Sequence, residues 1–96
     1  MTIYPGSTRL TGDGVVGISG KPTRVFFIHL ISGATGSTTT LENGTSASGT
    51  IYAQIDGVAS SGVTVNFAGG LLFPDGCFMD TDANISSAVI GYTSVS

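Results

Sequence analysis

The fold is decided by the stretch Thr-Arg-Val-Phe-Phe-Ile-His-Leu-Ile at positions 23–31, which is the longest apolar run in the chain. It is rich in β-branched and aromatic residues, which fit the pleated surface of a sheet. Strict alternation would divide the run into two faces: Val25, Phe27, His29 and Ile31 on one, and Arg24, Phe26, Ile28 and Leu30 on the other. Because both faces are mostly apolar, we expect a central strand with the core on one side and a second layer or a neighbouring subunit on the other.

The composition is typical of a small folded domain. With 96 residues the chain is near the common size of one domain and is long enough for a single core. Disordered chains have low hydrophobicity and usually high charge. Here 41% of the residues are hydrophobic and only 9% are charged, which excludes the disordered class. No stretch reaches the ~18–20 apolar residues that a membrane-spanning helix needs, so no membrane contact is expected.

Charge and cysteine content exclude further classes. The net charge is −3, and the only cations are Arg9, Lys21 and Arg24, which are too few and too scattered to bind nucleic-acid phosphates. The first ten residues lack the basic start and apolar core of a signal peptide, so we expect synthesis in a cytoplasm. The single cysteine, Cys77, cannot form an internal disulfide, and its apolar neighbours predict a buried, inert thiol.

Residues 1–10 are expected to form an extended N-terminal arm, followed by a single β-sandwich domain of residues 11–96. Ile3 and Tyr4 are apolar anchors, and Pro5 biases Tyr4 toward extended backbone. An arm of this kind either pairs along the edge of a sheet or reaches across to a neighbouring molecule.

The rest of the chain alternates short apolar segments with turn signals. Asn43-Gly44 is the strongest hairpin signal, and its second strand begins near Thr45 or, if residues 46–49 form a wider loop, at Thr50. Alternation places one set of side chains on a common face in each of three segments: Ile51, Ala53 and Ile55; Val63, Val65 and Phe67; Ala88, Ile90 and Tyr92. The pattern predicts an all-β fold of about seven or eight short strands, an antiparallel β-sandwich or flattened barrel.

Two groups of residues are candidates for chemistry. His29 is the only histidine and lies in the most apolar strand, where a core or interface residue is commoner than a general base, so we expect no enzyme. Asp75, Asp80 and Asp82, with Asn84 nearby, could bind a hard cation, but the pattern lacks the glycine and terminal glutamate of a calcium loop. We favour acidic side chains beside a solvent-facing strand end, and expect no metal or cofactor.

Leu71-Leu72-Phe73 is a second informative apolar stretch. Three consecutive large apolar side chains in a strand cannot all face one core, so one should be exposed unless something covers it. Few surface charges oppose association, which favours a homo-oligomer. The alternative is a single sandwich in which a loop or the N-terminal arm covers the apolar strand.

Three segments resemble small virion proteins of tailed phages that infect cyanobacteria and other aquatic bacteria. They are Tyr-Pro-Gly-Ser-Thr-Arg-Leu-Thr-Gly-Asp-Gly-Val-Val at 4–16, Leu-Glu-Asn-Gly-Thr-Ser-Ala-Ser-Gly-Thr-Ile-Tyr at 41–52, and Leu-Phe-Pro-Asp-Gly-Cys-Phe-Met-Asp-Thr-Asp-Ala-Asn at 72–84. The resemblance covers essentially the whole chain and rests on turn motifs and strand rhythm. Members of this group look like capsid decoration (cement) proteins, often trimeric, that sit on the outer capsid surface and reinforce the shell.

The resemblance implies a virion protein whose partners are the major capsid protein and further copies of itself. The expected contact residues come from the arm and the two apolar strands: Ile3, Tyr4, Pro5, Arg9, Phe26, Ile28, Leu71, Leu72 and Phe73. The alternative function is a tail, fibre or host-surface recognition module, in which Tyr4, Tyr52 or Tyr92 stacks on sugars. A small hydrolase ranks last, because the chain offers only one histidine.

Overall fold

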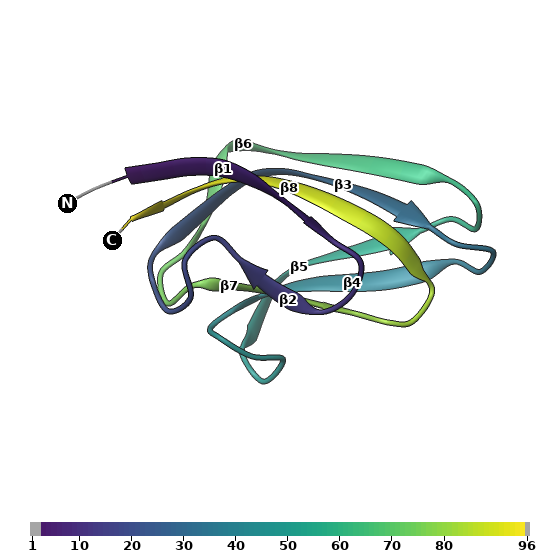
Figure 1. Ribbon diagram of the computed structural model, residues 1–96, viewed down its shortest axis with the longest axis horizontal. Coiled ribbons are helices and arrows are strands. Elements are labelled where there is room, and N and C mark those ends of the chain that lie inside the picture. The colour runs from purple at the N-terminus through teal and green to yellow at the C-terminus, as the bar shows by residue number, and fades with distance from the viewer. Residues whose placement is uncertain (1–2, 96) are drawn as a thin grey trace.

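The computed structural model describes residues 3–95, so Met1 and Thr2 of the expected arm and Ser96 lie outside the described residues. The strands are β1 (Ile3–Leu10), β2 (Gly14–Val16), β3 (Thr23–Ser32), β4 (Ser37–Asn43), β5 (Thr50–Gly57), β6 (Gly62–Phe73), β7 (Cys77–Thr81) and β8 (Ile85–Val95). They form two four-stranded antiparallel sheets packed face to face (Figure 1), which confirms the expected all-β sandwich. Across residues 3–95 there is no helix long and apolar enough to cross a membrane.

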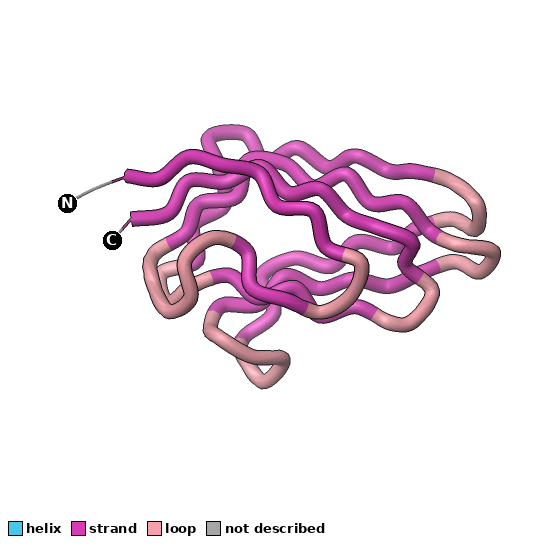
Figure 2. Tube along the Cα trace, viewed as in Figure 1, coloured by secondary structure: helices cyan, strands magenta, loops and turns pink. Residues whose placement is uncertain are grey.

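The strand order shows how one chain builds both sheets. The β1 sheet has the order β1-β8-β3-β6, and the β2 sheet has the order β2-β7-β4-β5. The pairs β4–β5, β3–β6, β2–β7 and β1–β8 enclose one another in turn, so the chain is one long antiparallel hairpin wrapped into two layers (Figure 2). This nested arrangement is the jelly roll.

Strand β3 lies inside its sheet, between β8 and β6, as the apolar run predicts. Its alternation breaks at Phe26, which is an extra residue relative to β8 and forms a β-bulge; on the other side, residues 67–70 of β6 are unpaired opposite it. Val25 faces the core before the bulge, and Ile28 and Leu30 face it afterwards. The predicted division into two faces is therefore wrong, because the extra residue shifts the alternation and leaves Phe26 and Phe27 both on the outer side.

The core fills the space between the sheets, and its large buried side chains come from both of them: Val16, Val25, Ile28, Leu30, Leu41, Phe73, Met79 and Ile90. Tyr52 stacks on Phe73 with ring centroids 5.2 Å apart. The contact follows from a second register shift, between β4 and β5, which leaves Tyr52 as the extra residue. Ile51 is consequently 56% exposed instead of inward as predicted.

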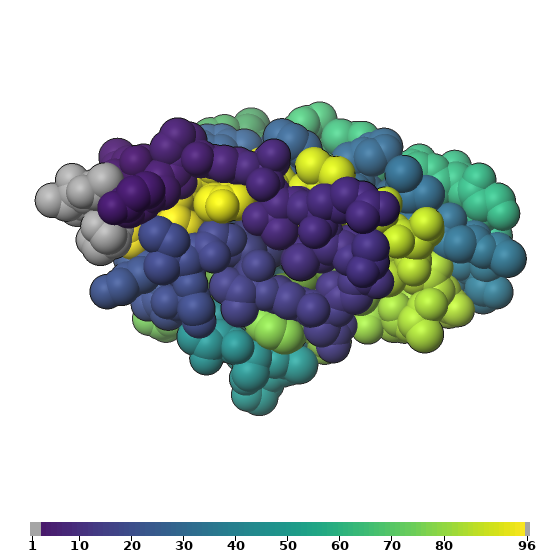
Figure 3. Space-filling model, viewed as in Figure 1, coloured from purple at the N-terminus to yellow at the C-terminus, as the bar shows by residue number. Residues whose placement is uncertain are grey.

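Strand β1 is an edge strand of its sheet. Every residue from Ile3 to Leu10 has an antiparallel partner in β8, from Val95 to Ala88. Of the two placements expected for the arm, the structure shows pairing along a sheet edge, and Leu10 also packs against the core. Figure 3 shows this strand lying along β8 on the surface of the molecule.

Candidate binding surface

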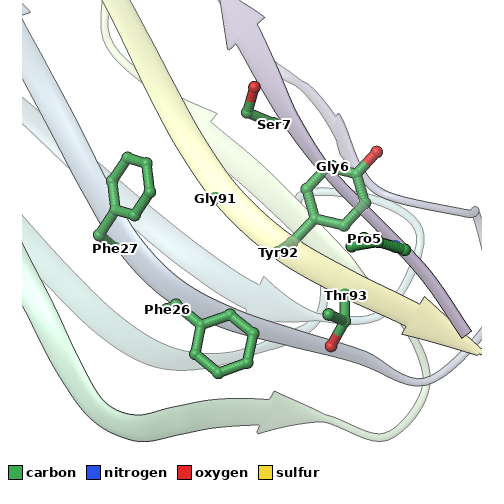
Figure 4. Close-up of a pocket in the computed structure, with 8 residues that line it drawn as sticks. All are labelled: Pro5, Gly6, Ser7, Phe26, Phe27, Gly91, Tyr92 and Thr93. Atoms are coloured by element: carbon green, nitrogen blue, oxygen red, sulfur yellow. The ribbon is translucent and has the colours of Figure 1, made fainter.

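The outer face of the β1 sheet carries an open hollow of about 580 Å³. Three neighbouring strands line it (Figure 4): Pro5, Gly6 and Ser7 from β1, Phe26 and Phe27 from β3, and Gly91, Tyr92 and Thr93 from β8. Ser7 lies opposite Gly91 and Pro5 opposite Thr93, on the face turned away from the core residue Ile90. The hollow is therefore a surface feature and not an internal cavity.

Two glycines leave room for the aromatic rings of this region. Gly91 lies opposite Phe27, and the Phe27 ring occupies the space that a side chain at position 91 would need. Gly6 lies opposite Tyr92, and a β-carbon at position 6 would come within 2.9 Å of the Tyr92 hydroxyl oxygen. An aromatic ring that covers a cross-strand glycine fills the space that a side chain of the glycine would otherwise occupy.

The lining combines aromatic rings with hydroxyl groups. Phe26 and Phe27 supply the rings, whereas the ring of Tyr92 packs against the core, and Ser7 and Thr93 supply hydroxyls that can donate or accept hydrogen bonds. None of the eight lining residues carries a carboxylate, an amine or an imidazole. The hollow can therefore hold a small apolar or uncharged polar group of a partner, such as a side chain or the face of a sugar ring.

The histidine and the cysteine lie elsewhere. The Nδ1 atom of His29 is 2.7 Å from the Thr64 hydroxyl oxygen, on the outer side of the β1 sheet. Cys77 is buried in the core, and this burial raises the pKa of its thiol from 9.0 to about 12. Cys77 therefore stays a neutral thiol at physiological pH, which confirms the buried thiol predicted for it.

The three aspartates of the candidate cation site do not converge. Asp82 accepts a hydrogen bond from the Thr38 backbone N–H at 3.0 Å, beyond the end of β7. Asp75 lies before the start of β7 and accepts a hydrogen bond from the Asn43 side-chain amide. Within residues 3–95, no three His, Cys, Asp or Glu side chains gather into a group that could hold a metal ion.

The expected contact residues divide between the surface and the core. Five lie on the outer side of the β1 sheet: Ile3, Pro5, Arg9, Phe26 and Leu72. Tyr4 is exposed at the start of β1, but it lies on the other face of the strand from Ile3 and Pro5. Leu71 is half-buried against the core. Ile28 and Phe73 are fully buried, which corrects the expectation for these two: they belong to the core and not to a contact surface.

Sequence reasoning did not assign Phe27, Gly91 or Thr93 to a contact surface. Phe27 was placed on one face by strict alternation, which the bulge at Phe26 disrupts. A signal was present at Gly91, because a glycine inside a strand marks a close approach of another group. The ring of Phe27 makes that approach here.

The fold defines a small jelly roll, and a comparison with solved structures finds a chain of similar fold. The chain is similar to a structure described as Bacillus endospore appendages that form a family of disulfide-linked pili. The TM-score is 0.50 at 15% sequence identity, with 97% of this chain and 86% of that chain covered, so the likeness shows the fold alone. No protein-family model matches the chain, and a search of curated proteins gives no match.

Proposed function

We propose that this chain is a structural virion protein, a capsid decoration protein that binds the outer surface of a phage capsid as a homo-oligomer and stabilises the shell. Its partners are the major capsid protein and further copies of itself. The observation that carries the proposal is the apolar exposure on the outer side of the β1 sheet, where Ile3 is 61%, Phe26 39% and Leu72 42% exposed. Exposed apolar groups gathered on one face are typical of a contact surface.

A decoration protein needs a rigid body and a surface that many copies apply together. The two packed sheets supply the body, and the outer face of the β1 sheet supplies a surface for contact between copies, which links many copies to one another on the shell. Individually weak contacts suffice, because attachment through many linked copies is far stronger than one contact. Jelly rolls occur in capsid and in lectin domains, so the fold is compatible with this role without selecting it.

Contacts between copies would be noncovalent in this proposal. The structurally similar appendages are described as disulfide-linked, whereas this chain has a single cysteine, Cys77, which is buried. Association must then come from the surface side chains of the folded domain.

The first test is quantitative mass spectrometry of purified source particles, counting this chain against the major shell protein. We expect a copy number comparable to that of the shell protein. A handful of copies per particle would favour a tail or fibre location, and complete absence would overturn the virion assignment.

The second test is binding of purified variants to particles that lack the chain. We expect Phe26→Ser combined with Leu72→Ser to weaken binding, while Val58→Ser, which changes a 72% exposed side chain in the loop after β5, binds normally. Substitutions are preferable to removing the arm, because Ile3–Leu10 is a paired strand whose loss would expose the edge of β8. Equal binding by all variants would contradict the assignment of this face.

A second candidate function is recognition of a host-surface glycan, and the hollow is the observation that favours it. Phe26 and the Thr93 hydroxyl line the hollow, whereas the ring of Tyr92, one of the tyrosines expected to stack on sugars, packs against the core. Tyr52 stacks on Phe73 instead. A glycan array would show saturable binding that Phe26→Ala abolishes if this function is correct, and no binding if the hollow contacts only protein.

A further inference from the structure

The charged residues are divided between the two sheets. All six acidic residues lie in strands of the β2 sheet or are hydrogen-bonded to them: Asp13, Glu42, Asp56, Asp75, Asp80 and Asp82. All three basic residues lie in strands of the β1 sheet or in the turn that enters β3: Arg9, Arg24 and Lys21. The sandwich is therefore electrostatically polar, with a positive β1 side and a negative β2 side.

Each of the two outer faces carries charged side chains of one sign. Arg9 is exposed on β1, and Arg24 lies on the outer side of β3, where its guanidinium donates to the carbonyl oxygens of Gly69 and Gly70 at 3.3 and 3.5 Å. Carbonyl oxygens are uncharged acceptors, so these bonds do not cancel the positive charge. On the opposite side of the molecule, Asp56 is exposed on β5 and Asp80 is partly exposed on β7.

We propose that the outer face of the β1 sheet of one molecule docks on the outer face of the β2 sheet of a second copy of this chain. Charge complementarity identifies the partner, because each face carries the sign that the other lacks. Both faces also carry exposed apolar side chains, Phe26 and Leu72 on the first and Ile51 on the second. The inference rests on the self-association in the proposed function and names the two surfaces that meet.

The shapes of the two sides are also compatible. Figure 1 shows the loop of residues 44–49, drawn in teal, projecting from the β2 side of the molecule. The hollow lined by Phe26 and Phe27 lies on the β1 side and is open. The projecting loop of one copy is the element that can enter the hollow of the next.

This contact joins different surfaces of the two copies and leaves one face of each copy free. Such head-to-tail interfaces extend into open rows unless the rotation between copies closes a ring. The two outer faces point in opposite directions, so an open row is expected in place of the closed trimer that the resemblance implies. A row of this kind would link neighbouring copies across a surface.

The experiment is sedimentation velocity of the purified full chain at low ionic strength, with two single variants and a charge control. Arg9→Glu alters the β1 face and Asp56→Lys alters the β2 face, and both positions are exposed. Lys21→Glu makes the same charge change as Arg9→Glu in an exposed turn that belongs to neither sheet. Thermal melting of each variant verifies that it is folded.

We expect wild type and Lys21→Glu to associate with increasing concentration and to dissociate at high salt. Arg9→Glu and Asp56→Lys alone should each lose about tenfold or more in association constant. Mixed together, they should associate in a one-to-one ratio, because each variant retains the face that the other lacks.

Three results would overturn the inference: a wild-type monomer at all concentrations, a closed trimer insensitive to these variants, or self-association of Asp56→Lys like wild type. The last result would indicate two β1 faces meeting each other. The measurement uses no particles, so it is independent of capsid binding. Monomers that bind particles would contradict the inference alone, and rows that bind no particle would contradict the proposed function alone.

Discussion

The ring of Phe27 covers Gly91, its partner in the β3–β8 pair, so that the glycine is buried although it lies on the outer side of the sheet (Figure 4). A β-carbon at position 91 would overlap the ring. This contact joins the bulged strand to the last strand and forms part of the floor of the hollow.

Substitution of Gly91 by alanine should destabilise the protein by about 1–3 kcal/mol, because the ring must move off its site. Urea denaturation measures the change. Gly12→Ala is the matched control, since a β-carbon there meets nothing within 4 Å, and it should change stability by less than about 0.5 kcal/mol. In the background Phe27→Ala, the alanine at position 91 should cost much less, and an undiminished cost would contradict the proposed overlap.

Ser94→Ala should cost about 1–3 kcal/mol. The Ser94 hydroxyl is fully buried, accepts a hydrogen bond from the Ile18 backbone N–H at 3.1 Å and lies 2.9 Å from the Thr23 hydroxyl. Removing it leaves the partly buried Ile18 N–H without its acceptor and the buried Thr23 hydroxyl, which donates to the Lys21 carbonyl oxygen, with one partner fewer. Ser86→Ala, at an exposed position of the same strand, should be nearly neutral in the same denaturation assay. Equal effects at both positions would show that the buried contact contributes nothing.

Glu42→Met should stabilise the protein by about 1–3 kcal/mol, because an apolar side chain of similar volume removes an incompletely satisfied buried carboxyl group. Glu42 is 2% exposed; its Oε2 accepts from the Thr40 hydroxyl at 2.8 Å, and its Oε1 has no hydrogen-bond partner among residues 3–95. Thr40 keeps a second acceptor, the Asp80 carbonyl oxygen at 3.4 Å. A loss of stability as large as that of Glu42→Ala would contradict the prediction.

The stability of the folded state should fall in alkaline solution through Cys77. Burial raises the pKa of this thiol from 9.0 to about 12, so the unfolded chain releases the proton at lower pH than the folded one. The contribution of the neutral Cys77 thiol to the free energy of unfolding is complete below pH 9.0. It is lost as the pH rises toward about 12, by up to ~1.4 kcal/mol per pH unit. Urea denaturation across this pH range should show the stability of wild type falling toward that of Cys77→Ala, which lacks the thiol. Parallel curves for the two proteins would contradict the prediction.

Strand positions were predictable wherever alternation is uninterrupted. Val63, Val65 and Phe67 lie along one face of β6 and pack against the core, as their spacing predicts. Leu72 is the exposed member of the apolar triplet. The wider of the two hairpin loops considered after Asn43 is the one found, because β5 begins at Thr50.

Features that depend on neighbouring strands were not predictable from local pattern. The bulge at Phe26 exists only relative to β8, and it moves Ile28 into the core and places Phe27 on Gly91. Likewise, Arg9 and Arg24 are scattered in sequence, and their common face emerges only when the nested pairing places β1 and β3 in one sheet.

The pairing of Ile3 with Val95 brings the two described ends of the chain together at one end of the sandwich (Figure 1). A pulling force applied between those ends would open the β1–β8 pair one residue at a time, starting at Ile3, so little force would be required. Force transmitted through the broad faces would instead act on the whole packed core at once. A chain built in this way resists mechanical load when it is held by its faces and yields when it is held by its ends.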